Sequence, residues 1–129
     1  WFSLDNPGQS PRVPVFCGVK DFPALFDICG NHRYRDDAAL WHYREANKLA
    51  AVKWGTFRKT MEKNIQHFEE KGQRELPFVE TQYQQILKEK GEEAAKAFLT
   101  GYTADFIGAT ILRWDEMARE FWIQSRFGL

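Results

Sequence analysis

The sequence has little cysteine and no excess of charge of either sign. Its 129 residues include only two cysteines, Cys17 and Cys29, and no CxxC motif, so neither a disulfide framework nor a thiolate metal or redox motif is indicated. Two small buried side chains are the simplest interpretation, and a single disulfide stays open in an oxidising compartment. Eighteen basic residues balance eighteen acidic ones, which argues against nucleic-acid binding and against polybasic membrane binding.

Long apolar runs are also missing. No stretch approaches the roughly 18 apolar residues of a membrane-spanning helix, and no signal peptide is visible. We therefore expect no membrane contact and a cytoplasmic location, with export of a longer parent protein left open. The first residue is Trp1, which fits a chain that is processed, trimmed or part of something longer.

Aromatic residues, in contrast, are abundant. They make up 16% of the sequence, with five Trp, four Tyr and eleven Phe. Such bulky side chains need a thick core or a large partner surface. The length suits one domain with a core of its own.

Prolines are concentrated near the start of the chain, where four of the five lie within the first 30 residues. Residues 1–4 and 12–17 read as two β-strands, joined by a turn at Asn6-Pro7-Gly8. Pro14 makes the second strand an edge strand or an irregular one. Because two strands do not form a stable sheet alone, this pair needs further strands from elsewhere.

Helical periodicity begins at residue 36. Apolar or small residues recur at steps of three and four and predict a helix over 36–71, with a kink or break near Gly55 and an end at Gly72. Arg58 and Glu62 can pair on its solvent face.

Two further helices are expected. One begins at Pro77, a residue type favoured in a first helical turn, and stops before Gly91. The other covers 92–124 and is split by Gly101, with Thr103 as a possible cap where it restarts. The sequence thus predicts an α+β fold of two strands followed by long helices, which fits the end of a larger enzyme better than a complete small protein.

Catalytic and metal-binding patterns are scarce. His32, His42 and His67 form no HxxxH pair, so no metal site is expected and each is interpreted as a surface or hydrogen-bonded histidine. Arg33 and Arg35 could grip a carboxylate, but local salt bridges at a helix start explain them better. Neither a glycine-rich phosphate loop nor a GxSxG motif is present, and we expect no cofactor.

Four stretches nevertheless resemble the late part of one enzyme family. They are residues 1–19, 28–39, 68–72 and 98–106, and they are similar to the C69 family of dipeptidases, which are N-terminal-nucleophile hydrolases related to the secernins. The resemblance implies that residues 1–129 are the C-terminal portion of a single peptidase domain, with a strand pair and connector over 1–30 and helices over 31–129.

The same resemblance implies an αββα fold and a cysteine nucleophile whose own α-amino group activates the thiol. Neither Cys17 nor Cys29 carries an α-amine, so the nucleophile is expected upstream, and this chain alone is expected to be inactive. No catalytic residue is assigned; Asn6 is the one candidate for substrate binding, although a turn-forming role explains it equally well. The implied partners are a dipeptide substrate, the upstream half of the protein and further copies in a homo-oligomer.

The alternative is a non-enzymatic helical module that pairs its aromatic stripes with a partner helix. The strand pair argues against it, because a purely helical module has no use for those residues.

Overall fold

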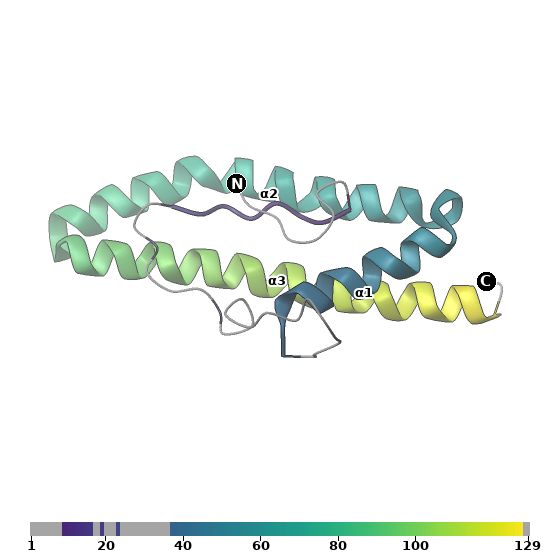
Figure 1. The fold of residues 1–129 in the computed structure, drawn as a ribbon. Helices are drawn as coiled ribbons and strands as arrows, with labels where there is room; N and C mark the ends of the chain where they lie inside the picture. The colour runs from purple at the N-terminus through teal and green to yellow at the C-terminus, as the bar shows by residue number, and fades with distance from the viewer. Residues whose placement is uncertain (1–8, 17–18, 20–22, 24–36, 128–129) are drawn as a thin grey trace.

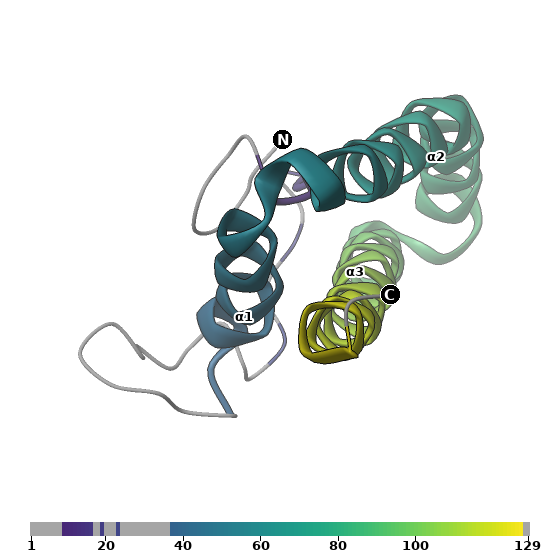
Figure 2. The same ribbon diagram turned by 90° about the vertical axis from the view of Figure 1, so that its right-hand side faces the viewer.

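The part of the chain that the structure describes forms three α-helices. A computed structural model describes residues 9–16, 19, 23 and 37–127, and the helices are α1 (Ala39–Val52), α2 (Trp54–Lys90) and α3 (Glu92–Phe127) (Figure 1). The two long helices, of 37 and 36 residues, lie side by side and antiparallel. The shorter α1 packs against α3, as the end-on view in Figure 2 shows.

The α+β prediction is wrong, because the part of the chain that the structure describes is all-α and contains no β-strand. The first expected strand, residues 1–4, lies outside the described residues. The second runs as an extended segment through residues 9–16, which we call the N-terminal strap. Pro11 and Pro14 carry no N–H, so this segment is poorly suited to a sheet ladder. Side chains of α1 and α3 bind it instead.

The expected helix over 36–71 is divided near its predicted break. The helical path stops at Lys53, whose φ of −130° and ψ of 58° are not helical, two residues before Gly55. The Lys53 carbonyl then accepts hydrogen bonds from the backbone N–H groups of Thr56 and Phe57, at 2.9 and 3.0 Å, and so starts α2. Because of this break, α1 and α2 have different directions, and each packs against α3.

α2 does not end at Gly72, nor does a new helix begin at Pro77. Both residues lie inside α2, and Phe68 and Val79 are buried on either side of them. Burial of that apolar face favours one continuous helix over the local preferences of glycine and proline. The helix ends at Lys90, and the predicted stop before Gly91 is confirmed by its φ of 92°.

α3 confirms the helix expected over 92–124 and extends it to Phe127. Gly101 does not split it, because Leu99 and Thr103 on its flanks are both buried. Thr103 therefore caps no helix; it lies within α3, where its side chain is fully buried.

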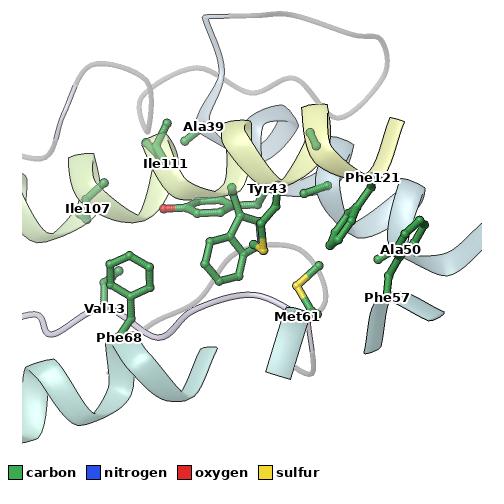
Figure 3. Close-up of a cluster of buried hydrophobic side chains, with 14 of the residues drawn as sticks. Val13, Ala39, Tyr43, Ala50, Phe57, Met61, Phe68, Ile107, Ile111 and Phe121 are labelled. Atoms are coloured by element: carbon green, nitrogen blue, oxygen red, sulfur yellow. The ribbon is translucent and has the colours of Figure 1, made fainter. Parts of the chain in front are cut away.

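The core lies where the three helices and the N-terminal strap meet (Figure 3). α1 contributes small residues and Tyr43, while α2 and α3 contribute large aromatic ones. Phe57 stacks on Phe121 with ring centroids 4.4 Å apart, and Phe68 lies 6.0 Å from both Phe106 and Trp114. Part of the aromatic content thus fills this core, as aromatic pairs add to the stability of apolar burial.

Candidate functional site

A set of polar side chains on the helices holds the N-terminal strap. Thr103 donates a hydrogen bond to the Pro14 carbonyl at 3.1 Å. The Trp114 indole N–H reaches the Gln9 carbonyl at 3.3 Å. Two segments far apart in sequence are therefore joined by bonds from helical side chains to strap carbonyls. We call these contacts, with those of Asn47 below, the strap clamp.

Asn47 completes the clamp from α1. Its amide Nδ2 donates to Ser10 Oγ at 2.9 Å, and its Oδ1 accepts from the Trp114 indole N–H at 3.3 Å. Asn47 and Ser10 are both buried. A carboxamide is no base, so this contact does not activate the Ser10 hydroxyl as a nucleophile. The clamp fixes the position of the strap and performs no chemistry itself.

A second buried pair links α1 to α3. The Tyr43 hydroxyl lies 2.8 Å from Thr110 Oγ1, and Thr110 in turn donates to the Ile107 carbonyl at 2.7 Å. Burial raises the pKa of Tyr43 to about 12; the hydrogen bond with Thr110 opposes this rise, and the charge of Asp115 adds to it. The phenol therefore stays neutral at physiological pH.

His42 forms the third link between these helices. Its Nδ1 lies 2.8 and 3.0 Å from the two carboxylate oxygens of Asp115. Both side chains are partly exposed. This agrees with the interpretation of His42 as a hydrogen-bonded histidine, and the contact joins α1 to α3 at the residue directly before Tyr43.

Tyr102 extends the polar contacts toward α2. Its hydroxyl donates to Glu75 Oε2 at 2.7 Å, and its ring meets that of Phe16 edge-on at 6.1 Å. Burial, followed by the hydrogen bond to the Glu75 carboxylate and the charge of that carboxylate, raises the pKa of Tyr102. Tyr102 thus ties the end of the strap to both long helices.

Open grooves lie on the described surface. One, about 740 Å³, is lined by Phe16, Val79 and Leu99 among others and runs beside the end of the strap. A second, about 500 Å³, lies between Trp41 on α1 and Trp122 on α3. Neither groove is lined by a nucleophile paired with a base.

A third groove, about 410 Å³, is lined in part by Lys63, His67 and Arg113. Arg113 already donates to Asn64 Oδ1 at 2.8 Å and pairs with the carboxylates of Glu116 and Glu120 at 3.2 and 3.0 Å. His67 is exposed on α2 and packs edge-on against Phe68. Because Arg113 is neutralised by its own neighbours, this groove has little net positive charge to offer an anion.

Several residues singled out from the sequence lie outside the described residues. They are the proposed substrate-binding residue, both cysteines, one histidine and the two arginines, namely Asn6, Cys17, Cys29, His32, Arg33 and Arg35. Of the other candidates, His42 and His67 make separate contacts. Among the described positions, no group of three His, Cys, Asp or Glu side chains could hold a metal ion. Measured over the same positions, no helix combines the length and the hydropathy that crossing a bilayer demands.

Sequence reasoning missed the role of the buried polar residues that hold the strap and join α1 to α3. Asn47, Thr103 and Thr110 occupy core-facing positions of α1 and α3, and no described buried polar side-chain atom lacks a hydrogen-bond partner. A polar residue on an apolar helical stripe is the signal that could have revealed them, since such a residue must find a partner inside the protein. The sequence does not show which carbonyl that partner is.

Comparison of the chain with protein-family models, with curated proteins and with solved structures finds no match. The functional argument therefore rests on the residues of this chain and their contacts.

Proposed function

We propose that this chain is the helical C-terminal part of a dipeptidase-like cysteine amide hydrolase, which cleaves dipeptides with a nucleophile supplied from elsewhere in the protein. One observation carries the proposal: three of the stretches that resemble the C69 dipeptidases, residues 1–19, 68–72 and 98–106, contact one another through the residues of them that the structure describes. Residues remote in sequence that share a resemblance and a contact are best explained by a common structural role.

The contacts between these stretches are specific. Thr103 donates to the Pro14 carbonyl, the rings of Phe16 and Tyr102 meet at 6.1 Å, and those of Phe68 and Phe106 meet at 6.0 Å. Each contact either fixes the strap on α3 or packs α2 against α3. In this proposal the chain supports the catalytic part of the enzyme, and its own residues position rather than react.

The proposal includes the partners implied by that role. The substrate is a dipeptide bound by the whole enzyme, with Asn6 as a contact residue, and the upstream half of the same protein covers part of this chain. The enzyme is a homo-oligomer in the cytoplasm. Exposed large apolar side chains support the presence of partners, among them Val52, Phe78 and Leu112, which are 71%, 65% and 62% exposed.

The test uses the whole natural protein that carries this chain. Unblocked dipeptides are incubated with it, and the released amino acids are measured by chromatography. N-terminal sequencing and a thiol-alkylating reagent identify the reactive cysteine. We expect hydrolysis, an upstream N-terminal cysteine as the alkylated residue, and loss of activity on its alkylation.

Cys17→Ser and Cys29→Ser are the matched variants within this chain. Both should keep most of the activity, because neither residue is the nucleophile in this proposal. Complete loss of activity in Cys17→Ser would contradict the upstream nucleophile, and a whole protein that hydrolyses no dipeptide would contradict the enzyme class.

A helical interaction module is the second candidate function. It is supported by the groove between Trp41 and Trp122, where two large aromatic side chains from α1 and α3 line an open apolar surface. The same assay separates the two candidates. A folded, monodisperse natural protein without amidase activity would favour the module.

A further inference from the structure

The outer face of α1 carries a stripe of four residues. Trp41, Glu45, Lys48 and Val52 follow one another at steps of four, three and four, which places them on one side of the helix. The core residues of α1, such as Tyr43 and Ala50, lie on the opposite side. We call the four residues the α1 stripe.

The α1 stripe has the same spacing in both directions along the helix. It reads apolar, acidic, basic, apolar from its first residue to its last. When a second copy of α1 lies antiparallel to it across a two-fold axis, Trp41 faces Val52 of the other copy. Glu45 then faces Lys48 of the other copy, and Lys48 faces Glu45. The stripe is therefore self-complementary, both in the positions of its apolar residues and in its charge, and an isologous interface requires such self-complementarity.

The surroundings of the stripe fit this arrangement. Trp41, Glu45, Lys48, Leu49 and Trp122 line the groove of about 500 Å³ between α1 and the last part of α3. Trp122 is 54% exposed and Val52 is 71% exposed, while Glu45 and Lys48 are both solvent-exposed. In the antiparallel pair the opposite charges of Glu45 and Lys48 therefore lie nearest the two-fold axis, and the apolar side chains, aromatic ones among them, lie on either side of them.

We propose that this face binds a second copy of the same chain, with the two α1 helices antiparallel about a two-fold axis. Each dimer contains two Glu45–Lys48 pairs, and Trp41, Val52 and Trp122 supply its apolar contacts. The stripe would be the contact surface of the homo-oligomer proposed above. The dimer does not depend on dipeptidase activity, which is measured in a separate assay.

The experiment exchanges the charges of the stripe in the intact protein. Sedimentation equilibrium gives the dissociation constant of the wild-type protein and of Lys48→Glu, Glu45→Lys and the double variant Glu45→Lys/Lys48→Glu. Each single variant places like charges opposite each other at both pairs of the dimer, so we expect its dissociation constant to rise about tenfold or more. The double variant restores opposite charges and should return the constant close to the wild-type value.

Lys59→Glu is the matched control, because Lys59 is an exposed lysine on α2 outside the stripe. It changes the net charge as Lys48→Glu does and should leave the dissociation constant unchanged. Circular dichroism of each variant confirms that the helices are intact. The wild-type constant should also rise with salt, since exposed charge pairs are screened.

Four results would overturn the proposal. They are a monomeric wild-type protein, single variants that associate as the wild type does, a double variant as weak as the single ones, and a dimer constant that does not respond to salt. A stripe covered by another part of the protein, or by a different protein, would produce the first or the second of these. Dipeptide hydrolysis is measured on the same samples, so that loss of the dimer and loss of the enzyme are told apart.

Discussion

At the scale of single residues, a few polar side chains decide where the N-terminal strap lies. Thr103 and Trp114 bind strap carbonyls that a β-sheet would otherwise have bound through its backbone, and Asn47 binds the Ser10 hydroxyl. A buried carbonyl without a partner costs free energy comparable to a lost hydrogen bond, so these three residues have a larger effect than their number suggests.

We predict that Thr103→Val destabilises the protein by about 1–3 kcal/mol, because valine keeps the shape of threonine but leaves the buried Pro14 carbonyl unpaired. Urea unfolding followed by circular dichroism measures the change. Thr81→Val is the control: the Thr81 hydroxyl is exposed and donates only to the Pro77 carbonyl within α2. It should change the free energy of unfolding by less than about 0.5 kcal/mol. If both variants changed the free energy of unfolding equally, the Thr103–Pro14 hydrogen bond would contribute no more to stability than the exposed one of Thr81.

A second prediction concerns alkaline pH. The pKa of Tyr43 is raised from 10.0 to about 12 in the folded protein, so between pH 10 and pH 12 the phenol ionises when the protein unfolds and remains neutral when it is folded. Unfolding then releases a proton, and stability must fall as the pH rises through this window, by up to about 3 kcal/mol at pH 12.

Tyr43→Phe removes this dependence, and its unfolding curves should fall less steeply between pH 10 and pH 12 than those of the wild type. At pH 7 the same variant should lose about 1 kcal/mol, since its hydrogen bond to Thr110 is gone. Tyr102, whose pKa is also raised, contributes in the same direction. Parallel pH curves for wild type and Tyr43→Phe would contradict the assignment.

What the sequence reveals at this scale depends on how local the contact is. The Arg58–Glu62 pair is confirmed at 2.7 Å, because two residues four apart on a helix always lie close together. The apolar stripe of α1 and α2 is also confirmed, with Tyr43, Phe57 and Met61 buried. The partners of Asn47 and Thr103 could not be predicted, since they lie far away in the chain and are set by the tertiary fold.

At the scale of helices, the glycines and the proline do not all mark boundaries. Gly72, Pro77 and Gly101 lie inside helices although each was interpreted as an end or a start. Gly91 does mark a boundary, because the chain adopts a positive φ of 92° there. Sequence alone does not separate these cases, since a continuous buried face can outweigh a local preference of about 1 kcal/mol for glycine.

Substitution by alanine should have opposite effects on stability at the two kinds of glycine. At Gly91 the backbone (φ 92°, ψ 178°) is open almost only to glycine, so Gly91→Ala should destabilise by about 1–3 kcal/mol. At Gly101 the backbone is helical and an added Cβ meets nothing within 4 Å, so Gly101→Ala should stabilise by about 0.5–1 kcal/mol. Thermal unfolding of both variants measures the difference, and the same sign for both would contradict the distinction.

At the scale of the whole molecule, the helical class of residues 37–127 could be predicted from the periodicity of apolar residues. The predicted strand pair could not be relied on, because the described part of its second strand is no strand. Residues 12–16 have the composition of a strand, yet they pack as part of a strap against helices, where Thr103 binds the Pro14 carbonyl and Trp114 binds the Gln9 carbonyl nearby in the strap. Composition predicts that the segment is extended, but only the tertiary fold determines which elements it packs against. The candidate site could not be predicted from the sequence either, because its hydrogen bonds join α1, α3 and the strap, which are far apart in the chain.

The strap clamp also has a consequence for the order in which the protein is made. Gln9 and Trp114 are 105 residues apart, and Pro14 and Thr103 are 89 apart. A ribosome therefore releases the strap long before it has synthesised the helix that binds it. The α2–α3 hairpin contains contacts closer in sequence, and closing a shorter loop costs less entropy. During synthesis the strap lacks its α3 partners until Thr103 and Trp114 have emerged, so a nascent chain that stalls between residues 16 and 103 presents to chaperones a segment that the finished protein partly buries.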